Sequence, residues 1–216
     1  MTISEGAAPY AARLEIDYPE RLDRLTSVFR LIWLIPIFVV AGVLAGSGSQ
    51  WVVTNSGEWV QGSAVGIGGG LFLATLLMIL FRRRYPRWWF DFHVELTRFS
   101  ARISAYAGLL TDRYPSTTDE QSVHLDIDYP DAGRDLNRWL PLVKWLLALP
   151  HWIILGVLSV LAMFAVVIAW FAILFTGRYP RRLFDFVVGV SRWGLRAWAY
   201  SFLLVTDRYP PFRLGA

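Results

Sequence analysis

Residues 145–177 read WLLALPHWIILGVLSVLAMFAVVIAWFAILFTG and contain no formal charge over 33 positions. A helix needs roughly 20 apolar residues to cross the hydrocarbon of a bilayer. Two further uncharged runs, residues 31–57 and 59–81, are 27 and 23 residues long. Runs of this length exclude a soluble globular protein as the expected class and predict a small polytopic membrane protein.

The composition agrees with this expectation and limits the classes of binding partner to be considered. Of the 216 residues, 55% are hydrophobic and 18% are charged, against roughly 25% charged in an ordinary soluble domain. The net charge of +4 comes with 20 arginines and one lysine, and cysteine is absent. Arginine is the better bidentate partner for phosphate, so we expect anionic membrane lipids as partners and no nucleic acid.

The chain repeats itself. FRRRYPRWWFDF at residues 81–92 matches FTGRYPRRLFDF at residues 175–186, and LLTDRYP near residue 110 matches LLVTDRYP near residue 204. Upstream, LEIDYP at residues 14–19 matches LDIDYP at residues 125–130. A fixed pattern at a nearly constant offset indicates internal duplication. We therefore predict a first repeat over 1–115, a linker over 116–124 and a second repeat over 125–216.

The strings TGRYPRRLFDFVVGVSRW and LLVTDRYPPF give the chain a recognisable likeness. It resembles the bacterial membrane family catalogued as domain of unknown function 4389, as two tandem copies. The resemblance implies a small integral membrane protein of unassigned role, and it brings no catalytic residues. The first copy departs from the pattern, with FRRRYPRWWFDFHVEL in place of the glycine-containing version.

Charge distribution predicts how the chain crosses the membrane. The segment at residues 47–63 holds no basic residue, and basic residues near span ends stay cytoplasmic. We expect a hairpin of helices at about 24–46 and 64–82 with this loop outside. A second hairpin, at about 138–157 and 158–176 with a tight external turn, keeps the later arginines on the same side. Both termini are then cytoplasmic, in the bacterial cytoplasmic membrane.

Two further stretches combine aromatic residues with arginines four apart. They span residues 88–110 and 183–204, and a helix with a basic stripe favours the headgroup plane over the bilayer centre. ARLEIDY and VHLDIDY alternate apolar and polar residues, which is a strand signal, and the two segments could pair as a ribbon. The expected fold is thus all-α integral membrane: a duplicated transmembrane hairpin followed by an amphipathic interfacial helix, with short β segments on the cytoplasmic side.

Arginine next to Tyr-Pro, or on one face of these helices, is the leading candidate for binding lipid phosphate. The simpler explanation, which we favour, is a helix-end charge that reaches the interface. The candidates are Arg84, Arg98, Arg102, Arg113, Arg178, Arg192, Arg196 and Arg208.

Small residues at a spacing of four predict close helix packing within the chain or in a homodimer. They are Gly62, Gly66, Gly70 and Ala74. Asp91 and Asp185 recur at one spacing after Arg-Tyr-Pro and could serve as acid or base groups, although helix capping or pairing with arginine explains them more simply. We expect no catalytic constellation, no metal site and no cofactor.

Three functions remain open on the sequence. The favoured one is a non-enzymatic scaffold, accessory subunit or anionic-lipid-interacting module, with a membrane protein partner or a second copy as a possible companion. A small transporter or channel would need a polar path, for which Thr75 and His151 are the candidates. An enzyme acting on lipid headgroups would use Asp91 or Asp185 with arginines holding the phosphate.

Overall fold

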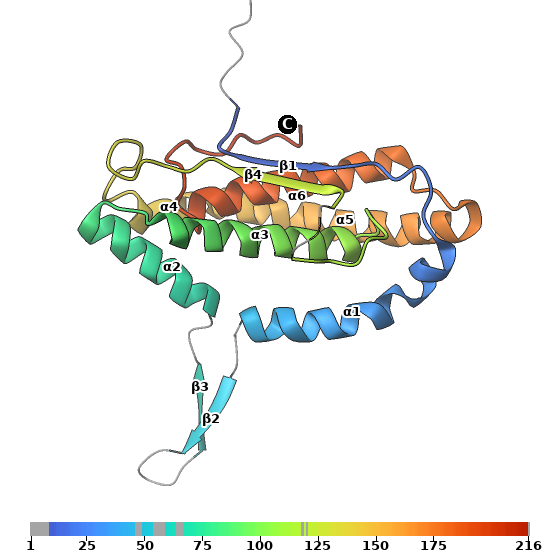
Figure 1. The fold of residues 1–216 in the computed structure, drawn as a ribbon, viewed down its shortest axis with the longest axis horizontal. Coiled ribbons are helices and arrows are strands. Elements are labelled where there is room, and N and C mark those ends of the chain that lie inside the picture. The colour runs from blue at the N-terminus through green and yellow to red at the C-terminus, as the bar shows by residue number, and fades with distance from the viewer. Residues whose placement is uncertain are drawn as a thin grey trace, which may run out of the picture.

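The protein is mostly helical, with two short antiparallel ribbons (Figure 1). The computed structural model describes residues 9–45, 49–53, 59–63, 67–117, 119 and 121–215. In chain order the elements are β1 (Ala12–Ile16), α1 (Arg24–Ala45), β2 (Ser49–Val53), β3 (Trp59–Ser63), α2 (Ile67–Leu77), the π-helical turn η1 (Met78–Arg82), α3 (Arg87–Ala107), β4 (Val123–Ile127), α4 (Pro141–Leu147), α5 (Leu149–Thr176) and α6 (Arg181–Ser201).

The two arginine-bearing helices form the middle of the molecule. α3 and α6 are 21 residues each, and each begins directly after the proline of a Tyr-Pro pair, with Pro86 and Pro180 at the N-cap. Backbone N–H groups in the first turn of a helix have no acceptor within the helix. Proline, which lacks this N–H, therefore fits the start of a helix without losing a hydrogen bond. Tyr85 and Tyr179 of these pairs are buried in the core, at 3% and 1% exposure.

The expected pairing of the two alternating segments is confirmed. β1 and β4 form an antiparallel ribbon in which Leu14 lies opposite Leu125. Their apolar side chains face inward, and β1 contacts α6 while β4 contacts α3. Arg192 on α6 donates to the Leu14 carbonyl at 2.8 Å, and Arg98 on α3 donates to the Leu125 carbonyl at 3.2 Å. Each strand is therefore fastened to the arginine-bearing helix of the other half of the chain.

The tight external turn predicted between residues 157 and 158 is wrong. α5 is one continuous helix of 28 residues, so the second half contains no hairpin of two helices there. The helix break falls earlier, at Ala148, where α4 ends and Pro150 occupies the first turn of α5. Gly156 is the one residue near the predicted turn that disfavours a helix, and a single glycine costs only about 1 kcal/mol.

In the first half, α1 and the continuous α2–η1 segment lie close to the two expected spans. The connection between them contains β2 and β3, which pair with each other and were not anticipated. Among the described helices, α5 alone is both long and apolar enough to cross a membrane.

The final Thr-Asp of each half anchors a cation that comes from an apolar helix. Lys144 of α4 donates to the Thr206 carbonyl at 2.7 Å, and its ammonium lies 2.7 Å from Asp207 Oδ1. Arg30 of α1 donates to the Thr111 carbonyl at 3.0 Å and pairs with Asp112. The Lys144 side chain is fully buried and that of Arg30 is 3% exposed, so both cations depend on these partners.

We expect Asp207→Asn to lower the free energy of unfolding by about 3 kcal/mol, because it leaves a buried ammonium without its counter-charge. Asp185→Asn is the matched control. It removes an exposed pair with Arg181, at 3.2 Å, and should cost under about 1 kcal/mol. Urea denaturation of both variants in mild detergent checks this, and equal losses would show that the buried pair has no special weight.

Candidate functional site

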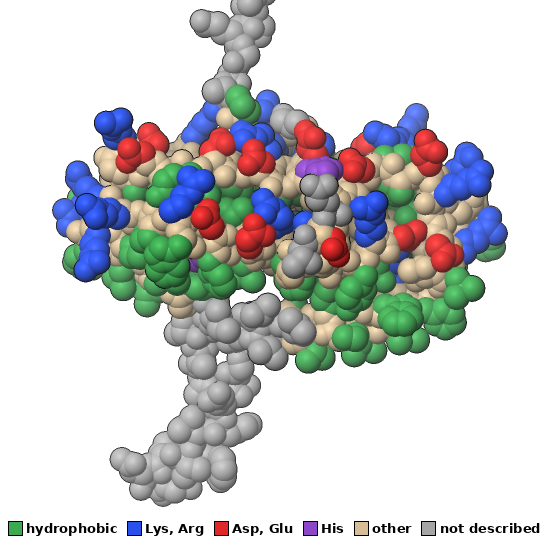
Figure 2. Space-filling view, in the orientation of Figure 1, with side chains coloured by type: hydrophobic (Ala, Val, Ile, Leu, Met, Phe, Trp, Pro, Cys, Tyr) green, Lys and Arg blue, Asp and Glu red, His purple; other side chains and the backbone are tan. Residues whose placement is uncertain are grey.

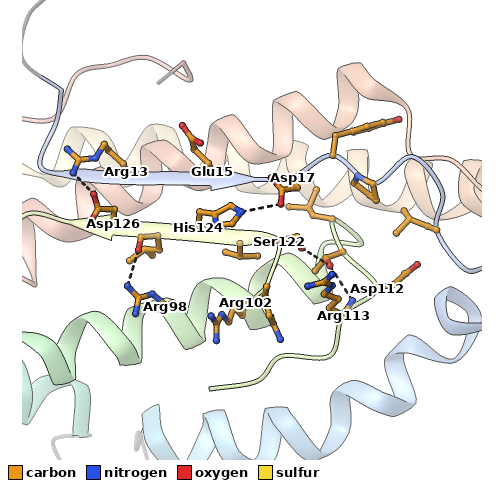
Figure 3. A pocket seen from close by; sticks show the side chains of 18 of the residues that line it. Arg13, Glu15, Asp17, Arg98, Arg102, Asp112, Arg113, Ser122, His124 and Asp126 are labelled. Carbon is orange, nitrogen blue, oxygen red and sulfur yellow. Dashed lines mark hydrogen bonds and ion pairs between the residues drawn. The ribbon is translucent and has the colours of Figure 1, made fainter. Parts of the chain in front are cut away.

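A polar cavity of about 1060 Å³ opens beside the ribbon, between β1, β4, the C-terminal half of α3 and the segment that follows it (Figure 3). Its charged lining comes from four separate parts of the chain. The acidic and basic residues are Arg13, Glu15, Asp17, Arg21, Arg98, Arg102, Asp112, Arg113, His124 and Asp126. Leu22, Leu110, Val123 and Leu125 supply apolar walls between these groups.

Several of these charges already have partners. Arg13 on β1 pairs with Asp126 on β4 and with Asp128, whose Oδ1 lies 2.6 Å away. Arg13 donates hydrogen bonds to the carboxylates of Asp128 and Asp126, and these bonds raise the pKa of Arg13. His124 Nε2 lies 3.1 Å from Asp17. These pairs hold the rim of the cavity on the outer side of the ribbon.

The floor of the cavity carries two of the predicted lipid-phosphate candidates. Arg98 pairs with Glu95 one turn earlier in α3. Arg102 is 8% exposed and donates to the Ser116 carbonyl, while its Nε is buried with no hydrogen-bond partner. A third candidate, Arg113, is exposed and lines the same cavity. The structure therefore brings Arg98, Arg102 and Arg113 together.

The other five arginine candidates lie elsewhere. Arg192 is bound to the β1 backbone, as described above, and Arg196 is 3% exposed and donates to the carbonyls of Gly215, at 2.7 Å, and Arg213. These two hold the ribbon and the C-terminal segment in place. Arg84, Arg178 and Arg208 are exposed outside the described cavities.

The small-residue series does not form one helical stripe. Gly62 lies in strand β3, and Gly66 falls outside the described residues. Only Gly70 and Ala74 lie on α2, and a Cβ added at Gly70 would meet nothing within 4 Å. The ladder prediction is thus wrong at Gly62, because the chain is extended there and spacing by four carries no meaning in a strand.

The polar residues considered for a transport path, Thr75 and His151, form hydrogen bonds inside the fold. Thr75 donates to the Leu71 carbonyl at 2.9 Å and accepts from the Trp89 indole at 2.9 Å. His151 accepts from the Trp193 indole at 2.9 Å and stacks on Phe212 with ring centroids 4.0 Å apart. Neither residue lines the second cavity, of about 460 Å³, which is mostly apolar and lies between α2, α3 and α6.

The carboxylates considered for catalysis are exposed. Asp91 lies 3.5 Å from Arg87 and Asp185 lies 3.2 Å from Arg181, each one helical turn apart. Neither carboxylate lines a described cavity. Among the described residues, no group of three or more histidine, aspartate or glutamate side chains is arranged to hold a metal ion.

Comparison with known proteins finds a family match only for the second half of the chain. Residues 138–213 match the family model "Domain of unknown function (DUF4389)". The match begins just before α4, extends into the C-terminal segment and covers less than half of the chain. It supports the resemblance inferred from the sequence for this half. No curated protein and no solved structure gives a significant match.

The cavity lies outside the DUF4389 match, since all of its lining residues precede Arg138. Sequence reasoning missed Arg13, Arg21 and His124 as members of the site. The alternating pattern of ARLEIDY and VHLDIDY placed Arg13 and His124 on a strand face. It gave no signal that this face would border α3.

The C-terminal segment depends on a close approach to α6. A Cβ at Gly189 would lie 2.9 Å from Leu214 Cβ and 3.2 Å from the Leu214 carbonyl oxygen. We expect Gly189→Ala to displace this segment and to speed tryptic cleavage after Arg208 and Arg213, measured by mass spectrometry. Gly194→Ala is the control on the same helix, where a Cβ meets nothing within 4 Å. Equal cleavage rates in the two variants would contradict this packing.

Proposed function

We propose that the protein is a non-enzymatic, lipid-interacting module of the membrane that inserts its apolar helices into one leaflet and keeps its charged groups in the headgroup region. The observation that carries this proposal is the segregation of exposed side chains. Hydrophobic side chains gather along the lower edge of the molecule in Figure 2, over α1 and α2, whereas charged side chains gather along the upper edge and at both ends.

The apolar surface is large and comes from long side chains. On α1, Ile32, Trp33 and Ile35 are each about 60% exposed. On α5, the side away from α6 exposes Ile153, Val157 and Phe164, with exposures of 58–69%. α1 and α5 contact each other, and the Trp170 indole donates to the Ser27 carbonyl at 3.0 Å. A continuous apolar surface of this kind is typical of a membrane or protein contact.

The packing of α5 favours a helix that lies along the membrane rather than across it. α5 runs alongside α6 in Figure 1, and its buried residues, from His151 to Ile173, mark one side along nearly the whole helix. A crossing α5 would therefore carry α6 through the bilayer with it. Arginine costs about 2.5–3.5 kcal/mol at the bilayer centre, and α6 bears Arg181, Arg182, Arg192 and Arg196. Orientation in the plane avoids this cost.

We include in the proposal that the two halves are copies of one unit. Supporting it are matched contacts: Arg30 and Lys144 to the two Thr-Asp pairs, and Arg98 and Arg192 to the two strands. α3 and α6 run in opposite directions in Figure 1. A two-fold relation along the membrane normal keeps the arginines of both halves on the same face, as the charge distribution requires.

The absence of cysteine allows depth to be measured at single sites. Spin labels on Val157→Cys, Phe164→Cys and Phe171→Cys sample one side of α5 over about 21 Å of helix. In lipid vesicles, oxygen and nickel-chelate accessibilities should give nearly one depth for all three sites. A helix that crosses the membrane would place the labels at clearly different depths, and that result would overturn the in-plane arrangement.

A charge placed on the apolar surface should weaken membrane attachment. We expect Phe164→Glu to lower the fraction of protein that floats with phosphatidylcholine vesicles in a density gradient, because a carboxylate would enter the hydrocarbon. Thr117→Glu, at an exposed loop position, adds the same charge and should float like the unmodified protein. If the two variants float alike, the α5 surface is not the lipid contact.

A further inference from the structure

The second cavity, of about 460 Å³, lies next to the inner face of the β1–β4 ribbon and between α2, α3 and α6. Leu14 and Leu125 of the ribbon line it, together with Leu71 and Phe72 of α2 and side chains of the two long helices. Its volume is within the range of small-molecule sites, roughly 300–1,000 Å³. The fold therefore leaves room for an organic ligand at this place.

The lining of this cavity is uncharged and offers little to a polar ligand. His93 is the only acidic or basic side chain among the described lining residues, and burial lowers its pKa, so the ring is neutral at pH 7. Each hydroxyl group of the lining already donates to the carbonyl four residues earlier in its own helix, at 2.7–3.0 Å. These hydroxyl groups belong to Thr97, Ser100, Ser104 and Ser191. An apolar ligand therefore fits the cavity better than a charged or polar one.

The cavity borders the apolar surface of the molecule. Its exposed lining residues include Gly68, Ser100, Ser104 and Trp198. α2, which forms one wall, lies along the lower apolar edge in Figure 2 and exposes Leu73 and Leu77, at 50% and 41%. Under the proposed function this edge faces the hydrocarbon of a leaflet, so lipid chains surround the mouth of the cavity.

The shape and chemistry of the cavity favour a hydrocarbon chain over water or a protein segment. Water finds few hydrogen-bond partners in an apolar cavity, and an empty space deprives its lining of van der Waals contacts. A helix is 10–12 Å wide with its side chains, so this volume would hold only about one turn of a second protein. A single unbranched chain is far narrower and can enter between the helices.

We propose that the second cavity takes up one acyl chain of a phospholipid from the surrounding leaflet. This assignment rests on the proposed function, because it needs the α2 edge to face hydrocarbon. The chain contacts Leu71 and Phe72 of α2 and the inner side chains of the ribbon. The headgroup stays outside, because the lining offers it no counter-charge.

Glycines allow the cavity to be filled without removing an existing contact. Gly194 of α6 and Gly68 of α2 both line it, and a Cβ added at either position would meet nothing within 4 Å. Gly194→Leu and Gly68→Leu therefore fill the cavity from two different helices, and leucine is a better helix former than glycine. The matched control is Gly156→Leu, at an exposed position of α5 outside the cavity where a Cβ also meets nothing within 4 Å.

The test places the full chain in vesicles of phosphatidylcholine that carries a photoreactive diazirine in one acyl chain. After illumination, mass spectrometry should find label on the tryptic peptides 103–113 and 197–208, which contain Ser104 and Trp198 of the lining. Both cavity-filling variants should lower this labelling at least about threefold, because the added side chain takes the space of several methylene groups in a closely packed interior. Gly156→Leu should leave it unchanged.

Labelling of the α5 peptide, residues 145–178, reports the membrane contact of the proposed function separately. If this peptide is labelled and peptides 103–113 and 197–208 are not, the acyl-chain site is overturned while the proposed function stands. If the α5 peptide is not labelled either, both fail. Equal labelling of peptides 103–113 and 197–208 in the cavity-filling and control variants would also overturn the acyl-chain site.

Discussion

The antiparallel packing of α5 against α6 is the constraint on which the rest of this structure depends. It joins the most apolar helix of the chain to a helix that carries four arginines. Because the two helices are packed together, neither can be positioned in a bilayer independently of the other. A charge is costly in hydrocarbon and an exposed apolar helix is costly in water. In the proposed membrane association, the pair therefore meets both constraints at the boundary, with α5 toward the hydrocarbon and α6 toward the headgroups.

Apolar helices and charged groups are also joined at the residues that anchor α1 and α4. Arg30 and Lys144 each directly precede a long uncharged run, and each contacts the Thr-Asp pair at the end of its half of the chain. Lys144 also lies over the Tyr200 ring, 5.2 Å from its centroid, and Arg30 lies over Tyr106 at 4.5 Å. The Thr-Asp pair in each of the recurring TDRYP strings is therefore explained as a structural anchor for an apolar helix.

Much of the local structure could be predicted because it depends on short-range pattern. Proline after tyrosine marked the starts of α3 and α6, and alternation marked β1 and β4, which also pair as anticipated. The turn near residue 157 was predicted wrongly from the requirement that all arginines lie on one side of the membrane. That reasoning assumed that a long apolar run must cross the bilayer, whereas the fold offers it a neighbouring helix to lie against. The polar cavity itself could not be predicted, although Arg98, Arg102 and Arg113 were among the candidates, because its lining comes from segments far apart in the sequence.

The crossed strands explain why both halves of the chain contribute to the polar cavity. β1 lies on α6 and β4 lies on α3, so each half contributes a strand to the other. The cavity forms where β1 and β4 meet α3, and it is lined from both sides of the predicted repeat boundary. A single half would have the arginines of α3 without both walls of the ribbon. The cavity therefore needs a strand from each half of the chain, although no lining residue lies beyond Asp126.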